Sequence, residues 1–159
     1  MNKSFVRAKF QPSANQEMKL QRLVNTYRDA IKKAVDENCT TLSEVNEIVT
    51  PYDLPYQAKD ALKTYVPMLV NKYNISRVRS DHPVRMVNRA AKIDFSSNEG
   101  FIWNVPQPGR KTNFKVVLHT NLDQQNYWMK IANNKIKKGG LLLQKTNRNW
   151  IVQIKIRNK

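Results

Sequence analysis

Cations interleaved with aromatic side chains are the residues of this sequence best suited to bind a ligand. Arg and Lys side chains neutralise phosphates, and exposed Tyr or Trp rings stack on unpaired bases, which is worth roughly 1–3 kcal/mol per base. Residues 75–159 hold 17 basic and 4 acidic residues, a net charge of +13, whereas residues 1–74 hold 11 and 8, a net charge of +3. Such an uneven field predicts a polyanionic partner, most commonly nucleic acid. General solubility or an anionic lipid surface is the alternative.

The aromatic residues of the second half have two possible roles, base stacking or core packing. They are Trp103, Tyr127, Trp128 and Trp150. Because a small sheet must bury some large apolar side chains, we expect at least two of the four in the core. The many lysines near predicted turns have no compensating acid after Asp123, which favours a phosphate-facing surface.

Motifs for covalent chemistry are missing from the sequence. It contains no G-x-S-x-G, P-loop or dinucleotide-binding pattern, and its carboxylates are scattered where a two-metal nuclease needs several that converge. We therefore predict no catalytic residue, no metal and no cofactor. The alternative is an enzyme with an unrecognised carboxylate site that uses Asp81 or Asp94. His82 and His119 lack an identifiable catalytic partner, and Cys39 is expected to be a half-buried apolar residue.

The elements that must position these residues begin with a strand and a long helix. Residues 5–10 alternate imperfectly, with Phe5, Arg7 and Lys9 on one side and Val6, Ala8 and Phe10 on the other, and Pro12 ends this predicted strand. Ser13 and Gln16 form a capping-box pattern, after which apolar residues recur at helical spacing to about Glu37.

Two further helices are predicted before residue 75. Thr41 caps a short one that ends at Pro51. The next begins near residue 53, with Asp53 as its cap and Pro55 in the first turn. Pro67 is expected to kink or split this third helix, because proline removes a backbone hydrogen bond.

From residue 76 onward the sequence predicts a basic connector followed by short strands. The strands are separated by polar turns, which is typical of a small antiparallel sheet or barrel. In the last strand, polar and basic residues alternate with apolar ones, so one face is expected to be mostly polar and basic. The predicted strands are residues 92–95, 100–105, 114–120, 127–132, 141–145 and 149–156.

Length and composition predict one soluble folding unit of the α+β class. A chain of 159 residues suits one core, and no run approaches the roughly 18 apolar residues of a membrane helix. The amino terminus has no apolar segment typical of a signal peptide, so we expect a cytoplasmic protein with no membrane partner.

The order of these features resembles the amino-terminal part of the TnpB (OrfB) family of transposon-encoded RNA-guided nucleases. The resemblance depends on three segments, FVRAKFQPS at residues 5–13, LPYQAKDALKTY at residues 54–65 and KKGGLLLQKTNRNWIVQIKIRNK at residues 137–159. Family members typically begin with a strand of the type K-x-F-R-L-Y-P-T, start a helix with L-P-S-Q, and reach a hairpin of the type x-W-Y-V-S-x-x-V. The resemblance covers essentially the whole sequence.

The resemblance implies a fold and a function. The fold would be a small antiparallel, oligonucleotide-binding-like (wedge) β-barrel made of residues 1–12 and 76–159. A helical recognition bundle, residues 13–75, would be inserted after the first strand. The function would be binding of guide RNA and of target-adjacent DNA.

The resemblance also implies site residues. The start of the L-P-x-Q helix and the turn before the later strands would approach DNA; these residues are Tyr56, Lys59, Lys63, Ser96, Ser97 and Asn98. Barrel strands, basic loops and the basic connector would hold RNA; these residues are Arg7, Lys9, Arg77, Arg79, Arg85, Arg89, Lys135, Lys137, Lys138, Lys145 and Arg148.

This sequence departs from the family in ways that limit the implied activity. It contains neither the G-I-D-L-G aspartate of the RuvC nuclease domain nor zinc-ribbon cysteines, both of which lie downstream in the family, and Tyr56 replaces a common small residue. We therefore expect no DNA cleavage by these residues alone, and a RuvC nuclease domain as a missing downstream partner. A small DNA-binding regulator with a helix-turn-helix in residues 13–74, usually a dimer on paired half-sites, is the alternative function.

Overall fold

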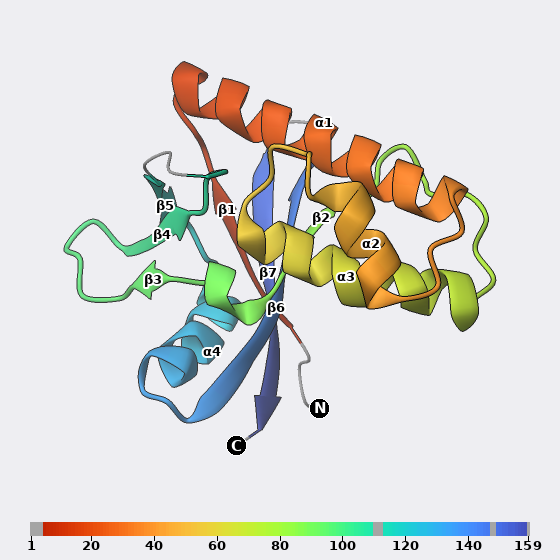
Figure 1. Cartoon of the computed structure of the whole chain (residues 1–159). Helices are drawn as coiled ribbons and strands as arrows, with labels where there is room; N and C mark the ends of the chain where they lie inside the picture. The colour runs from red at the N-terminus through yellow and green to blue at the C-terminus, as the bar shows by residue number, and fades with distance from the viewer. Residues whose placement is uncertain (1–4, 110–112, 147–148, 159) are drawn as a thin grey trace.

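The α+β class predicted from the sequence is confirmed. A computed structural model of the chain describes residues 5–109, 113–146 and 149–158. Within these ranges the chain forms four α-helices and two small antiparallel sheets (Figure 1). Helices α1 (Ala14–Asp36), α2 (Leu42–Val49) and α3 (Tyr56–Asn71) follow the first strand and precede the second, so the helical segment lies between strands of one sheet along the chain.

Local capping signals set the starts of the first two helices. Helix α1 (Ala14–Asp36) has the predicted capping box, in which Gln16 N donates to Ser13 Oγ at 3.2 Å and Ser13 N donates to Gln16 Oε1 at 3.0 Å. The side chain of Thr41 accepts from the backbone N–H of Glu44 at the start of α2 (Leu42–Val49). Both predicted caps are therefore confirmed.

The third helix begins later than predicted and is not split. Helix α3 (Tyr56–Asn71) has Pro55 as its N-cap, without a side-chain cap, so the prediction of Asp53 as the cap was wrong. Leu54 and Pro55 are buried, and this packing fixes the entry of the chain into the helix. The helix continues through Pro67 to Asn71, because its apolar side packs on the core along its length.

Sheet A joins the two ends of the described chain. Its strand order is β1-β7-β6-β2, with β1 (Phe5–Phe10), β7 (Trp150–Asn158), β6 (Ile136–Lys145) and β2 (Val84–Met86). Strand β1 is antiparallel to β7, from the pair Phe5–Lys155 to the pair Phe10–Trp150. The short β2 lies within the predicted basic connector. It was missed because its three residues form a strand only through pairing with β6.

Sheet B lies beside the other edge of β1. It consists of β3 (Ile93–Asp94), β4 (Phe101–Val105) and β5 (Phe114–Leu118) in that order. One isolated bridge connects the two sheets: Lys9 N donates to His119 O at 2.9 Å, and His119 N donates to Lys9 O at 2.7 Å. The described strands form two separate antiparallel sheets and no closed barrel. The prediction of antiparallel strands is therefore confirmed, and the closed barrel is not observed among the described residues.

Residues 127–132 were predicted as a strand and are helical. They form the end of α4 (Leu122–Ala132), in which the Asn121 side chain caps Gln124 N at 3.0 Å. The helix buries Trp128 and Ile131, which are three residues apart and lie on one side of it. A short apolar run does not distinguish a strand from a buried helix, and the helical pattern is visible only when the mostly polar residues 121–126 are included.

One continuous core serves the helices and both sheets. The largest fully buried side chains come from α1, α3, α4 and the strands, and they include Tyr27, Leu62, Trp103, Trp128 and Trp150. A short 3₁₀ helix, η1 (Asn88–Ala90), follows β2 and contributes Ala90 to this core. Among the described residues, no helix combines the length and apolar character needed to span a membrane.

Candidate nucleic-acid interface

Six cations share the side of sheet A that faces away from the core. In the row across the sheet, Arg85 on β2 pairs with Leu142, Leu142 pairs with Gln153, and Gln153 pairs with Arg7 on β1. Paired positions lie on one face, and so do alternate residues of a strand. We call the resulting set the basic face; it consists of Arg7, Lys9, Arg85, Lys137, Lys155 and Arg157.

A β-bulge decides which lysine of β6 joins the basic face. Register shifts between Lys138 and Leu141, so that Lys137 pairs with Arg157 although Leu142 pairs with Gln153. Regular alternation from Leu142 would have placed Lys138 on this side instead. Lys138 pairs with the buried Ile156, and its Nζ donates to the carbonyl oxygen of Ala91. Burial lowers the pKa of Lys138 from its ordinary value.

The basic face lacks compensating acids. Within the described ranges, none of its six side chains forms an ion pair with a carboxylate. Arg7 Nε instead donates to Gln153 Oε1 at 2.7 Å, and the guanidinium of Arg85 lies over the Tyr65 ring at 4.1 Å from its centroid. Both contacts orient the guanidinium groups and leave their full positive charge unneutralised.

Several other cations predicted to bind RNA are paired within the protein. Lys145 pairs with Glu17, and this hydrogen bond is the main reason that the pKa of Glu17 is lowered. Arg79 pairs with Asp81 at 2.9 Å. Arg89, on η1, pairs with Asp60 of α3. The charges of Lys145, Arg79 and Arg89 are therefore partly neutralised by carboxylates of the same protein.

The remaining predicted RNA contacts lie outside the basic face. Arg77 is exposed in the connector between α3 and β2, and Lys135 is exposed in the turn between α4 and β6. Arg148 lies outside the described residues. The structure thus gathers Arg7, Lys9, Arg85 and Lys137 from the predicted RNA set onto one surface and leaves the other seven elsewhere or undescribed.

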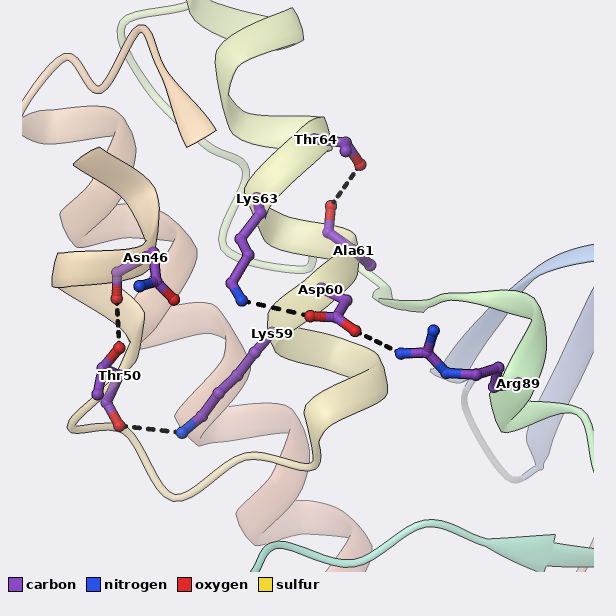
Figure 2. Close-up of polar contacts among 8 residues, drawn as sticks. All are labelled: Asn46, Thr50, Lys59, Asp60, Ala61, Lys63, Thr64 and Arg89. Atoms are coloured by element: carbon purple, nitrogen blue, oxygen red, sulfur yellow. Dashed lines mark hydrogen bonds and ion pairs between the residues drawn. The ribbon is translucent and has the colours of Figure 1, made fainter. Parts of the chain in front are cut away.

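The residues predicted to bind DNA on α3 are partly engaged in structural contacts. Lys59 Nζ donates to the carbonyl oxygen of Thr50 at 2.9 Å, which ties α3 to the end of α2 (Figure 2). Lys63 Nζ lies 3.3 Å from Asp60, whose carboxylate also accepts from Arg89 (Figure 2). Tyr56 remains 72% exposed at the start of the helix and is free to meet a ligand.

The second part of the predicted DNA group is not brought to α3. Ser96, Ser97 and Asn98 lie in the loop between β3 and β4, where both the N–H and the hydroxyl of Ser96 donate to Asp94. This loop projects from sheet B away from the start of α3 (Figure 1). The two halves of the predicted DNA site are therefore separate surfaces.

An open groove lies between α3 and the basic face. Its volume is about 630 Å³, within the range of roughly 300–1,000 Å³ that is usual for ligand sites. Apolar and aromatic side chains of Phe5, Tyr65 and Met68 line it together with cations. Among the described lining residues there is no Asp or Glu, and five are cationic: Arg85, Lys137, Lys138, Lys155 and Arg157.

Two members of the basic face, Lys155 and Arg157, were not among the predicted site residues. The signal that could have identified them is the alternation in the last strand, where they fall on the same side as Gln153. Their pairing with β1 and β6, which adds the other cations to that side, is not visible in the sequence.

The tryptophans are core residues and do not form an exposed stacking surface. Trp103, Trp128 and Trp150 are all buried, so the expectation that at least two of the four aromatics are in the core is confirmed. Trp103 Nε1 donates to Ala90 O at 2.8 Å, and Trp128 Nε1 donates to Arg7 O at 3.1 Å. Tyr127 is half-buried. Base stacking would therefore have to use other rings, such as Tyr56.

The candidate catalytic carboxylates are occupied by neighbouring donors. Arg79 beside Asp81 holds the pKa of that carboxyl below its ordinary value, and the hydrogen bonds from Ser96 do the same for Asp94. Lowered pKa values keep both groups ionised and make them weak general bases. No group of three His, Cys, Asp or Glu residues in the described part of the chain could hold a metal ion.

His82 and Cys39 have packing roles. His82 Nε2 lies 3.1 Å from Tyr65 Oη, its Nδ1 lies 2.8 Å from Pro83 O, and its ring packs on Tyr27. Burial lowers the pKa of His82. Burial also raises the pKa of Cys39, which keeps the thiol protonated and unreactive.

The connection between α2 and α3 differs from that of a helix-turn-helix. Six residues, 50–55, separate the end of α2 at Val49 from the start of α3 at Tyr56. The DNA-binding motif typically has a turn of about 3–4 residues. In addition, the backbone N–H of Val87 donates to Gln57 O at 3.1 Å, so the beginning of α3 is anchored next to β2.

Comparison with known proteins gave no identification: no family model matches the chain, and no curated protein matches it.

Proposed function

We propose that this protein binds nucleic acid through the basic face and performs no covalent chemistry there. The observation that supports this proposal most directly is the set of six cations on one side of sheet A without a carboxylate partner among the described residues. Cations held on paired strands need little rearrangement to meet a row of phosphates.

The pair Lys137–Arg157 supports an anionic ligand in particular. The two residues lie directly opposite each other on antiparallel strands, where like charges are destabilising by a fraction of a kcal/mol, up to about 1 kcal/mol. A phosphate placed between two such cations removes their repulsion and gains charge-assisted hydrogen bonds. Binding of an anion at this position would therefore relieve the repulsion between Lys137 and Arg157 in the free protein.

The finer proposal is a guide-RNA- and target-adjacent-DNA-binding module of a TnpB-type RNA-guided nuclease. Its support is the sequence resemblance described above, in which a first strand, an L-P-x-Q helix and a final hairpin follow in the family's order. A wedge-type barrel belongs to this finer proposal. In it, the residues described here hold RNA and DNA by charge and shape, and a RuvC domain would supply cleavage.

Fluorescence anisotropy at several salt concentrations tests the proposal. The probes are a labelled structured RNA and a labelled DNA duplex. If all six cations of the basic face contact duplex phosphates, the logarithm of the association constant should fall with the logarithm of salt concentration with a slope of about −5. Negligible binding of both probes at low salt would overturn the proposal. Tight dimeric binding of one duplex sequence would instead favour the helix-turn-helix regulator.

A further inference from the structure

The groove between α3 and the basic face is lined by apolar and aromatic side chains as well as by cations. We propose that it binds one unpaired nucleotide, with the base inside the groove and the adjoining phosphates on the cations at its mouth. This inference rests on the proposed function and adds to it a preference for a single-stranded segment. The observations that lead to it are the apolar side chains that line the groove, the position of Arg85 over the Tyr65 ring and the glycine-containing bulge of β6.

The walls of the groove suit the flat faces of a base. The Arg85 guanidinium lies over the Tyr65 ring at 4.1 Å from the ring centroid, and both groups line the groove. Bases stack readily on Arg guanidinium planes and on aromatic rings. Phe5 and Met68 also line the groove and are 40% and 39% exposed, which leaves apolar surface available to a ligand.

The mouth of the groove suits phosphates. Lys137 and Arg157 are opposite each other, and Lys155 lies two residues before Arg157 on β7, on the same side of the sheet. The side chains of all three are exposed. A groove with apolar walls and cationic edges therefore matches the two parts of a nucleotide, whereas an acidic peptide would use only the charges.

The bulge of β6 brings two glycines, Gly139 and Gly140, into the groove lining. An added Cβ at Gly139 would lie 3.3 Å from Cβ of Lys155, and one at Gly140 would lie 3.3 Å from the backbone oxygen of Met86. Both contacts are tighter than ordinary van der Waals contact. Glycines at these two positions thus let β6 approach its neighbours where it lines the groove.

An unpaired nucleotide fits this groove better than a base pair. In a duplex, each base is stacked on its neighbours and paired to its partner, so its flat faces are not available to protein walls. Inserting such a base first requires unpairing and unstacking, which costs a few kcal/mol. A single-stranded segment enters without this cost, and the groove should therefore select unpaired RNA or DNA.

A comparison of three probes tests the proposal. They are a short oligothymidylate, an abasic strand of the same length and the corresponding thymidine–adenosine duplex, each measured by fluorescence anisotropy at one salt concentration. Because stacking of one base changes affinity by about 5- to 150-fold, oligothymidylate should bind at least about 5-fold more tightly than the abasic strand. An oligouridylate identifies the source: tighter binding than oligothymidylate points to RNA and weaker binding to DNA, and both support the proposal.

A substitution that fills the groove without changing its charge isolates the base-binding step. Thr64 lines the groove from α3 and is exposed, so Thr64→Met, which adds bulk without a ring on which a base could stack, should occupy the space of the base. The preference for oligothymidylate over the abasic strand should fall to near unity, with abasic and duplex binding unchanged. Gln125→Met, at an exposed position of α4 outside the groove lining, is the matched control and should keep the preference.

A second variant keeps the test valid if Thr64→Met does not fold. Arg85→Lys retains the positive charge and removes the planar guanidinium that lies over Tyr65, so it should reduce the ratio of oligothymidylate to abasic affinity at least about 3-fold, whatever its effect on the abasic strand itself. Circular dichroism and thermal unfolding would verify that each variant is folded.

The results of these experiments distinguish a failure of the groove proposal from a failure of the proposed nucleic-acid-binding function. Equal binding of oligothymidylate and the abasic strand by the unchanged protein, or an unchanged preference in folded Thr64→Met, would overturn the groove proposal while nucleic-acid binding stands. Competition by polyglutamate as strong as that by oligothymidylate of equal charge would also overturn it, since a peptide then fits as well. Failure to bind any nucleic-acid probe at low salt would overturn the proposed function itself.

Discussion

The double substitution Lys137→Gln and Arg157→Gln should weaken nucleic-acid binding without weakening the fold. These two residues are the cross-strand cation pair of the basic face, and both side chains are exposed. Glutamine keeps most of the side-chain length and removes the charge. The change therefore tests whether this pair contacts phosphates or merely adds to the net charge of the protein.

The expected loss of affinity follows from counterion release. Each phosphate contact on a single strand contributes about 0.7 to the salt slope, so losing two contacts should reduce the slope by about 1.4. With the electrostatic contribution taken as small near 1 M salt, this corresponds at 0.1 M salt to a loss of about 25-fold, or about 1.9 kcal/mol. Fluorescence anisotropy titrations of a single-stranded probe between these concentrations would measure it.

Stability should change in the opposite direction. Removing like charges that face each other across two strands should leave the free energy of unfolding unchanged or raise it by as much as about 1 kcal/mol. Urea unfolding with an unchanged m-value would measure this difference. A protein that binds more weakly and is at least as stable has lost a ligand contact and not its structure.

A control with the same loss of net charge completes the test. Lys32 and Arg79 are exposed cations outside the basic face, and each pairs with a nearby carboxylate, Asp36 or Asp81. Lys32→Gln with Arg79→Gln should leave the salt slope almost unchanged. If this control weakens binding as much as the variant on the basic face, the reasoning is refuted, because total charge and not the surface would then determine affinity.

Three further predictions concern the fold. Ser13→Ala removes the N-cap of α1 and half of its capping box, so chemical denaturation should show a loss of about 1 kcal/mol, and a loss below about 0.3 kcal/mol would show that the cap is not needed. Asp60→Ala removes the carboxylate that joins Lys63 and Arg89, and because these side chains are partly exposed the loss should be about 0.5–1 kcal/mol; an unaffected stability would mean that solvent screens both pairs. Burial lowers the pKa of His82 below its ordinary value of 6.5, so the unfolded chain binds more protons as the pH falls below 6.5, and stability should decrease from there through the lower pKa of the folded state. Urea unfolding between pH 7 and 5 should show this decrease, and a His82→Phe variant should not; the same slope in both proteins would exclude His82 as its source.

Elements specified by nearby residues were predictable from the sequence. The Ser13 and Thr41 caps and the alternation in β1 depend on side chains within a few residues of one another. Pairing partners far along the chain were not predictable in this way. Strand β2 is only three residues long and exists because Val84 and Met86 pair with β6, so its apolar residues were hidden in a basic segment.

The candidate site shows the same division. Charge counts located the excess of cations in the second half, and the alternation in the last strand placed Lys155 and Arg157 on one side. The sequence did not reveal that Lys145 is paired with Glu17, a residue 128 positions away, or that the tryptophans leave no exposed stacking surface. Ion pairs and burial depend on which distant segments meet, and charge counts alone contain no such information.

The sequence by itself determined the α+β class, the first two helices, the alternating first and last strands and the polyanion-attracting charge, because each depends on composition or on local periodicity. The tertiary structure decided which cations act together. It paired β1 with β7, and the bulge at Gly139 and Gly140 shifted the register of β6. That shift placed Lys137 on the basic face and directed Lys138 toward Ala91, because a one-residue slip exchanges the two faces of a strand.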